Sequence, residues 1–426
     1  MTGRFATTAL PPMRLFAAAT PTPATRSNPE IAQDFIDLSF RLETGDELPG
    51  FARFTGSMSV RLTGQVPATA PRDLAALLGR MRAEAGLPIA QTSDPDAAIT
   101  VEFVPRRQLQ ARAPDAACFV APRVGSWAEY RRAGGATLDW ASFQNRDRMA
   151  IFIPADVAPQ EIRDCLHEEL AQALGPLNDL YRLPDSVFND DNMQSVLTGF
   201  DMLILRATYA PELQPGMARS TVAARLPGIL ARLNPAGEHS GGVTAPTPRA
   251  YGDAIARALG RRASPGGRQA AAKAALALSD PWQDGRTGFA WLTLGRVSGR
   301  DEGSQAYGAF QNAAVIFRSR GLPLHLAHAH TQLAAFALAQ GRWDDVLALT
   351  DAALPAATRG QNAALMAGLM MLRSEALART GQGQAAARLR LDSLGWARYG
   401  MASDAEVLRR LASIAAIAAQ SEEIAR

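Results

Sequence analysis

The sequence is poor in cysteine, histidine and lysine. Its 426 residues contain two cysteines, five histidines and a single lysine, Lys273, among 44 basic side chains. Two cysteines without Cys-x-x-Cys spacing supply too few ligands for a zinc site built on thiolates alone. The arginines are scattered, and no basic stripe with interleaved aromatic residues is present. Because nucleic-acid-binding proteins need such a stripe, we expect no nucleic-acid partner.

Long hydrophobic runs are also missing. No apolar stretch reaches the roughly 18 to 20 residues that a transmembrane helix needs, so we expect no transmembrane segment. Residues 1–27 contain a short apolar stretch that is broken by Pro11, Pro12 and Arg14 and followed by small residues. Two interpretations of residues 1–27 stay open, a disordered tail and a degenerate signal segment.

The two cysteines, Cys118 and Cys165, bear on the compartment. A disulfide between them would link a strand to a helix and would imply an oxidising environment, which favours the periplasm or the cell envelope. The alternative is a pair of buried, reduced thiols that act as small hydrophobic side chains, and this leaves a cytoplasmic location open.

The composition, with 47% hydrophobic and 20% charged residues, is that of an ordinary globular protein. A chain of this length exceeds what one hydrophobic core usually holds, so two domains are expected. Residues 234–248 are rich in proline and glycine and form the clearest boundary. We therefore predict a first domain over residues 28–233, a linker over 234–248 and a second domain over 249–426.

The first domain alternates between helical and strand periodicity. Apolar residues recur every three to four positions in some segments and every second position in others. The sequence thus predicts a mixed sheet backed by helices, an α+β domain. Its predicted helices are residues 29–40, 72–86, 158–174, 195–209 and 218–233, and its predicted strands are residues 57–64, 97–104, 116–121 and 148–154.

The second domain is rich in alanine, leucine and arginine, with helical periodicity throughout. Turns that begin at Gly303, Gly341 and Gly381 lie 38 and 40 residues apart. This spacing favours an all-α helical-repeat domain of the tetratricopeptide-like kind, which would bind a protein or a peptide. A plain helical bundle is the alternative.

Residues 167–179 carry the most specific pattern in the chain. From Glu168 onward they follow E-E-x-x-Q-x-x-G-x-x-N, which is the spacing H-E-x-x-H-x-x-G-x-x-H of zinc peptidases with each histidine replaced by an oxygen-bearing side chain. Glu168 and Gln172 share one helix face, and Glu169 lies beside them. Asn178 stands at the third ligand position, and Asp179 can substitute for it.

The oxygen ligands change the expected metal. Catalytic zinc prefers imidazole and thiolate, whereas carboxylate and amide oxygens suit calcium, magnesium or manganese. We therefore expect zinc to be absent and a hard divalent cation to be possible. If the site is active, Glu169 is the candidate general base.

The pattern extends beyond the helix. Residues 164–179, 186–191, 197–206 and 209–211 together resemble DUF2927, a bacterial family of unknown function, and the resemblance covers residues 27–234. The same segments resemble distantly the metzincin-type zinc peptidases, which implies a zincin-like fold. That resemblance places Glu168, Gln172 and Asn178 at the three histidine positions and Glu169 at the catalytic glutamate.

In the same comparison, the peptidases have a turn with methionine after the zinc helix. Phe188 replaces this methionine in the turn that starts at Ser186, while Asp201 and Tyr209 fall in the following helix. The resemblance supplies no substrate.

Three functions are compatible with these patterns. The leading hypothesis is a non-catalytic binding protein of the cell envelope, with a degenerate metallopeptidase-like domain and a helical domain that binds a protein or peptide. The second is an active metallohydrolase or peptidase that uses Glu169 with non-histidine ligands. The third is a cytoplasmic scaffold whose function lies in the tetratricopeptide-like repeats.

Overall fold

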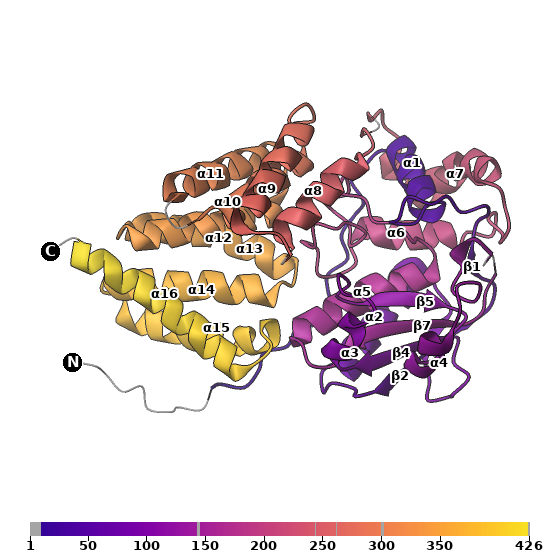
Figure 1. The fold of residues 1–426 in the computed structure, drawn as a ribbon, viewed down its shortest axis with the longest axis horizontal. Coiled ribbons are helices and arrows are strands. Elements are labelled where there is room, and N and C mark those ends of the chain that lie inside the picture. The colour runs from indigo at the N-terminus through magenta and orange to yellow at the C-terminus, as the bar shows by residue number, and fades with distance from the viewer. Residues whose placement is uncertain (1–9, 143–144, 243, 261, 300–301, 425–426) are drawn as a thin grey trace. The chain divides into compact units, whose positions relative to one another are not determined.

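The structure is a computed structural model that describes residues 10–142, 145–242, 244–260, 262–299 and 302–424 (Figure 1). The chain divides into two compact units. The first comprises Ala18–Pro246, and the second comprises the residues up to Ala17 together with Thr247–Arg426. Within the described ranges, no helix is both long enough and apolar enough to cross a membrane.

The first unit is built on a five-stranded sheet with the strand order β3-β2-β4-β7-β5. The four strands β3, β2, β4 and β7 run parallel, whereas β5 lies antiparallel to β7, with Val120 opposite Ile151. All six positions of β7 are buried, as the continuous apolar run at residues 149–154 predicts for a central strand. The strand bounds are β2 Met58–Gly64, β3 Ile89–Gln91, β4 Ile99–Val104, β5 Phe119–Pro122 and β7 Met149–Pro154.

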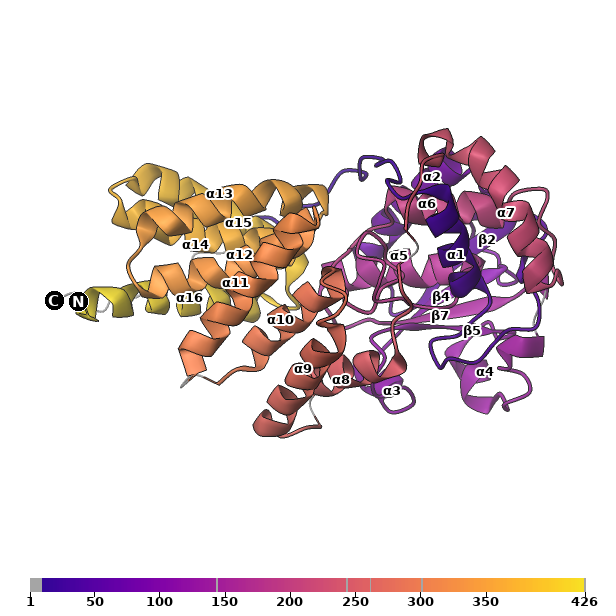
Figure 2. The ribbon, with the colours of Figure 1, turned by 90° about the horizontal axis from the view of Figure 1, so that it is seen from above.

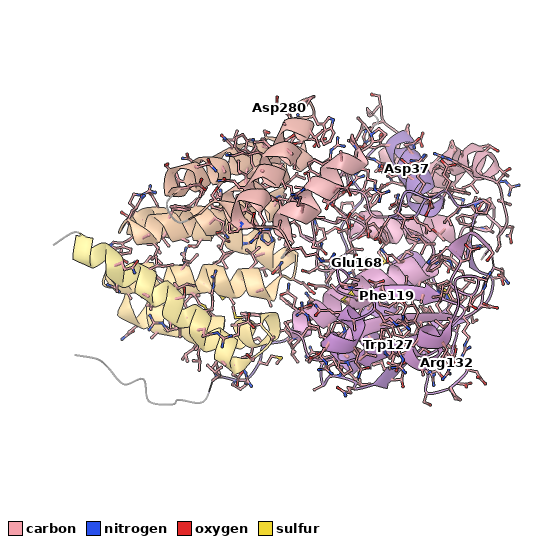
Figure 3. All side chains as sticks on the ribbon, viewed as in Figure 1. Asp37, Phe119, Trp127, Arg132, Glu168 and Asp280 are labelled. Carbon is pink, nitrogen blue, oxygen red and sulfur yellow. A yellow bond between two sulfur atoms is a disulfide. The ribbon has the colours of Figure 1, made fainter. Side chains whose placement is uncertain are left out.

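Helices cover both faces of this sheet, which confirms the predicted mixed sheet backed by helices. The long helices α2 (Ala70–Ala85) and α5 (Pro159–Leu174) pack in the larger core with Val101 and Ile151. The short helices α3 (Arg106–Gln110) and α4 (Trp127–Arg132) cover the other face. There Trp127 and Phe119 pack around Phe152, with ring centroids 5.1 and 5.3 Å from it (Figure 3).

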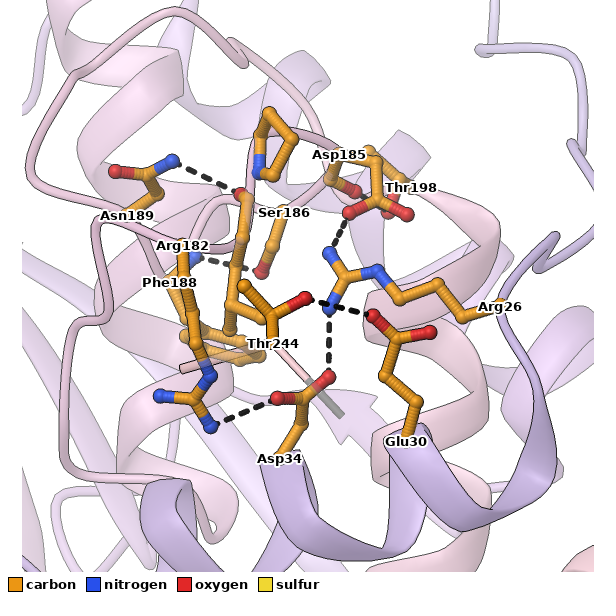
Figure 4. Close-up of polar contacts among 12 residues, drawn as sticks. Arg26, Glu30, Asp34, Arg182, Asp185, Ser186, Phe188, Asn189, Thr198 and Thr244 are labelled. Carbon is orange, nitrogen blue, oxygen red and sulfur yellow. Dashed lines mark hydrogen bonds and ion pairs between the residues drawn. The ribbon is translucent and has the colours of Figure 1, made fainter. Parts of the chain in front are cut away.

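A network of ion pairs fixes α1 (Asn28–Ser39) to the chain that follows α5. Asp34 accepts hydrogen bonds from Arg26 at 2.6 Å and from Arg182 at 2.8 Å, and Arg26 also pairs with Asp185 (Figure 4). Because Asp34 and Arg182 are almost completely buried, losing either partner would leave an unpaired charge in the core.

The segment predicted as a linker packs on the same helix. Thr244 donates to Glu30 at 3.1 Å, and the Asn28 side chain donates to Glu238 at 2.6 Å and to the Asn234 carbonyl at 3.1 Å. Residues 234–246 therefore belong to the first unit, and the division between the units falls at residue 246. The helices α6 (Gly199–Thr208) and α7 (Arg219–Leu233) complete this unit.

The second unit is all helical, which confirms the predicted fold class of this region (Figure 2). A residue with positive φ ends a helix at positions 321, 341, 361 and 381, a spacing of 20 residues. After each one an amide donates to a carbonyl five residues earlier, as from Arg342 to Ala337 at 2.9 Å, which is the Schellman termination. Its helices are α8 Arg249–Leu259, α9 Pro265–Ser279, α10 Gly285–Val297, α11 Gly303–Ser319, α12 Pro323–Ala339, α13 Trp343–Arg359, α14 Ala363–Arg379, α15 Gly383–Gly400 and α16 Asp404–Ile424.

The C-terminal end of α5 is held by a buried arginine. Arg146 lies in the two-residue strand β6 (Asn145–Arg146), which pairs with β1 (Arg53–Phe54). Its guanidinium donates to the carbonyls of Gln172 and Ala173 at 2.6 Å and of Gly175 at 2.7 Å. Burial lowers the pKa of Arg146 to about 10, which still leaves it charged near neutral pH. One cation thus donates to the last carbonyls of the helix, and its positive charge lies at the negative end of the helix dipole, where it is favourable.

Replacing Arg146 with methionine should destabilise the first unit by about 3–5 kcal/mol, because buried carbonyls would lose a charged donor. Arg148→Met is the matched control, since Arg148 is half exposed and pairs with Glu129 on the surface, where an ion pair contributes less than about 1 kcal/mol. Urea denaturation followed by hydrogen exchange of the α5 amides measures both variants. Equal effects of the two substitutions would contradict the capping role.

Candidate functional site

The helix α5 places the predicted site residues against the edge of the sheet. It starts after Ala158 with Pro159 in its first turn and ends at Gly175. A disulfide joins Cys165 on α5 to Cys118, which directly precedes β5. This bond holds the middle of the helix beside the edge strand, so that the side chains one turn further along face β5.

A cavity of about 420 Å³ lies between α5, β5 and several loops. Its lining is acidic and contains no lysine, arginine or histidine. Three carboxyl groups come from α5 and the loop after it, and three more come from loops. These are Glu168, Glu169 and Asp179 in the first group, and Glu43, Asp115 and Asp190 in the second. Phe119, Trp140 and Leu177 provide apolar surface between them.

Glu169 is the most deeply placed of these groups. Its side chain is 5% exposed, and its carboxylate accepts a hydrogen bond from the Val120 amide of β5. The second oxygen, Oε2, has no hydrogen-bond partner. Burial raises the pKa of Glu169 well above its usual value, and the neighbouring carboxylates of Glu168 and Glu43 raise it further. Asp179 Oδ1 also has no hydrogen-bond partner, so the cavity contains two buried carboxyl oxygens without a donor.

The neighbouring carboxyl groups are shifted in the same direction. Burial, with smaller contributions from Glu43 and Asp190, raises the pKa of Glu168 to about 8. Burial also raises the pKa of Asp179 well above its usual value, and Gln172 Nε2 donates to this carboxylate at 3.1 Å. Near neutral pH the cavity consequently retains protons that isolated carboxyl groups would have lost.

Four of the five predicted ligand-position and base residues line the cavity: Glu168, Glu169, Gln172 and Asp179. Asn178 does not, because its side chain donates to the Asp37 carbonyl of α1 at 3.0 Å. Across the described residues, no three His, Cys, Asp or Glu side chains are grouped so that they could hold a metal ion. The carboxyl groups come from α5 and from separate loops, and Glu43 is hydrogen-bonded to Asp179.

The other residues that the sequence pattern singled out support the helix from outside the cavity. Asp201 accepts hydrogen bonds from the Ser186 hydroxyl at 2.5 Å and the Val187 amide at 3.2 Å, which fixes the turn that contains Phe188. Tyr209 donates to the Leu174 carbonyl at 2.9 Å, at the end of α5.

His167, next to the acidic pair, has a structural role. Its side chain is 5% exposed, and Nδ1 accepts a hydrogen bond from the Leu197 amide at 3.1 Å. Burial lowers the pKa of His167 well below its usual value, and the nearby cations Arg163 and Arg80 lower it further. A neutral imidazole that points away from the cavity is neither a ligand nor a proton donor there.

Three lining residues, Glu43, Asp190 and Trp140, are not identified as part of the site by the sequence pattern. Asp190 lies in a segment whose composition predicts a turn, and the turn does form, since the Asp191 amide donates to Asn189 at 3.0 Å. Glu43 and Trp140 lie far from α5 in the chain and carry no local motif. Only their placement at the mouth of the cavity identifies them.

Residues 28–228 match the family model described as protein of unknown function (DUF2927). This match covers the sheet, α5 and the turn at Ser186. No curated protein and no solved structure matches the chain.

The raised carboxyl pKa values predict how the stability of the first unit varies with pH. A group whose pKa is higher in the folded state stabilises the fold at low pH, and this contribution disappears as the pH rises through the folded pKa. From about pH 6.5 to about pH 8 we therefore expect the free energy of unfolding to fall, as Glu168 releases its proton. Burial of neutral His167 makes the free energy of unfolding rise with pH, but only below the ordinary histidine pKa of 6.5.

Glu168→Gln should flatten this slope and raise the stability near pH 8 by about 1–3 kcal/mol, since glutamine stays neutral. Glu212→Gln is the control, because hydrogen bonds lower the pKa of this surface carboxyl and keep it ionised throughout the range. Urea denaturation at several pH values supplies the measurement. A slope that Glu168→Gln leaves unchanged would contradict the assigned shift.

Proposed function

Residues 28–228 of this chain belong to DUF2927, a family of unknown function, and we propose that this domain is a non-catalytic binding module for a cationic organic group. The group is an ammonium or guanidinium carried by a peptide or protein. The observation that carries the proposal is the unpartnered Oε2 of Glu169 in an acidic cavity whose lining, among the described residues, contains no lysine, arginine or histidine.

Charge complementarity supports an organic cation. Several carboxyl groups share one cavity, and their mutual repulsion costs free energy that a bound cation would remove. A guanidinium has five donors spread over a plane, which suits acceptors spread along a wall. A hard divalent cation would need oxygen ligands that converge within about 2.0–2.6 Å of one point. The dispersed arrangement of Glu168, Glu169 and Asp179 therefore favours the organic cation over the metal.

The edge of the sheet supports a peptide as the carrier. β5 is the terminal strand in the sheet order, and its residues Phe119 and Val120 line the cavity. Because the Val120 amide already donates to Glu169, a peptide along this edge would be held by its side chains and not by strand pairing. A lysine or arginine side chain would then reach Glu169.

We keep the degenerate metallopeptidase-like origin of the site as part of the proposal. α5 carries its acidic pair and Gln172 into one cavity, whereas Asn178 is engaged with α1. The second candidate is an active hydrolase in which Glu169 is the base. What favours it is the pKa of about 8 for Glu168, since a carboxyl that stays protonated near neutral pH can act as a general acid.

For the helical unit we propose binding of a protein or a peptide. Support comes from a groove of about 510 Å³ along α11, α12 and α13, where Val315 is 61% exposed beside the cations Arg318 and Arg342. Arg342 pairs with Asp345 in the same groove, which leaves Arg318 as the cation that would meet an acidic group of a partly apolar segment. A peptide-display screen tests this assignment. It would be contradicted if the intact chain enriches no acidic sequences, or if the Arg318→Glu variant enriches the same sequences as the intact chain.

We also propose a location in the periplasm or cell envelope. The disulfide between Cys118 and Cys165 supports it, since such bonds persist mainly in oxidising compartments. Mass mapping that finds both thiols free in protein from its native host would contradict this location and favour the cytoplasm.

The binding proposal is tested with capped pentapeptides of alanine that carry arginine, lysine or norleucine at the centre. We expect the arginine peptide to bind at least about tenfold more tightly than the norleucine peptide, given the strength of charge-assisted hydrogen bonds. Its affinity should rise as the pH approaches and passes about 8, because Glu168 must release its proton to hold a cation. Isothermal titration calorimetry in two buffers measures both the affinity and the proton release.

Glu169→Gln should abolish the preference for arginine, whereas Glu161→Gln, on the same helix but outside the cavity, should keep it. Binding of magnesium, calcium or manganese without peptide binding would favour the metal site instead. Mass spectrometry of the incubated peptides tests catalysis. Cleavage that requires Glu169 would overturn the non-catalytic assignment.

A further inference from the structure

Residues 10–17 form an N-terminal segment that lies on the helical unit, whereas the chain from Ala18 onward belongs to the first unit. This segment is part of the region for which a disordered tail or a degenerate signal segment was predicted. It has no regular secondary structure. Its contacts are therefore those of an extended peptide on a folded surface.

Three hydrogen bonds hold the main chain of this segment. The Arg14 amide donates to the Gly395 carbonyl of α15 at 2.9 Å. Arg398 Nη1 donates to the Pro11 carbonyl at 3.0 Å, and Gln361 Nε2 donates to the Ala17 carbonyl at 3.0 Å. The segment is thus held near its start, in its middle and at its end by groups of the helical unit.

Two side chains of the segment enter specific contacts. The ring of Phe16 packs at a tilt of 31° against Trp396, with centroids 4.5 Å apart, and lies edge-to-face with Tyr399 at 5.9 Å. Arg14 pairs with Asp392. An arginine and an aromatic residue two positions later therefore meet a carboxylate and two aromatic rings on α15. We call Gln361, Asp392, Gly395, Trp396, Arg398 and Tyr399 the docking face.

Gly395 shapes the docking face for close contact with a main chain. A Cβ at this position would lie 3.0 Å from Arg14 Cγ and 3.2 Å from the Pro12 carbonyl oxygen, both closer than ordinary contacts. Glycine inside a helix is less favourable than alanine. At this position it leaves room for the segment to approach the helix.

The segment is held weakly enough to leave. The side chains of Arg14 and Asp392 are 50% and 49% exposed, so their ion pair contributes little in water. Ordering an extended chain costs conformational entropy at every residue, and few buried contacts offset that cost here. Segments of this kind open locally without unfolding the domain.

We propose that the docking face is a peptide-binding site for extended segments with an arginine two residues before an aromatic residue, and that residues 10–17 occupy it within the chain. A partner protein with the same pattern binds when it displaces this internal segment. The site is separate from the groove of α11, α12 and α13, and it selects a basic and aromatic sequence instead of an acidic one.

A labelled peptide of residues 10–18 and the full-length chain test this inference by fluorescence anisotropy. In the wild type, the attached segment competes at an effective concentration of millimolar order. The double variant Arg14→Glu with Phe16→Ala should release it and bind the free peptide at least about tenfold more tightly than the wild type. Leu15→Ala is the matched control, because Leu15 is 38% exposed and lies between the two contact residues, and it should bind as the wild type does.

Charge exchange establishes specificity. Asp392→Arg, combined with Arg14→Ala and Phe16→Ala so that the attached segment carries no matching charge, should weaken binding of the peptide by a few fold, and a peptide with glutamate in place of Arg14 should recover it. Hydrogen exchange of the Arg14 amide provides a second measurement in the full chain and should accelerate in the double variant but not in Leu15→Ala. The inference is overturned if the opened variant binds no more tightly than the wild type, or if a scrambled peptide binds equally well.

Discussion

The position of α5 depends on one buried cation, because Arg146 satisfies the final carbonyls of this helix in a place where water does not reach them. The disulfide at Cys165 restrains the same helix against the edge strand. Between these two fixed points lie Glu168 and Glu169, which face the cavity. Carboxyl groups that repel one another can stay together only because the helix that carries them is held at both places.

Burying several carboxyl groups in one cavity therefore costs free energy of folding, and the rest of the first unit offsets this cost. In the network around α1, the buried carboxylate of Asp34 has partners in Arg26 and Arg182. In the cavity, Glu169 Oε2 has none, and protons are retained instead. Functional sites are where proteins commonly accept such a cost. This contrast within one unit is why we assign the binding function to the cavity and not to the larger charged network around α1.

The helical unit obtains its regularity from repeated helix ends. Positive φ at intervals of 20 residues lets each helix stop and the next pack against it. Such an array presents several faces of similar construction, and two of them differ in chemistry. The groove of α11, α12 and α13 is basic and apolar, whereas the docking face offers Asp392 with aromatic rings. We therefore propose two kinds of segment as ligands of one array.

The sequence alone determined the elements whose signal is local. Periodicity predicted the strand at residues 149–154, the helix that ends at Gly175 and the mixed sheet backed by helices. It did not predict β3, because three residues are too few to show a period. The pattern around Glu168 predicted which side chains share a helix face. Only the tertiary structure turned Asn178 toward α1, brought Glu43 and Asp190 to the cavity and laid residues 10–17 on α15. These placements depend on contacts between residues far apart in the chain, whose energies no local spacing encodes.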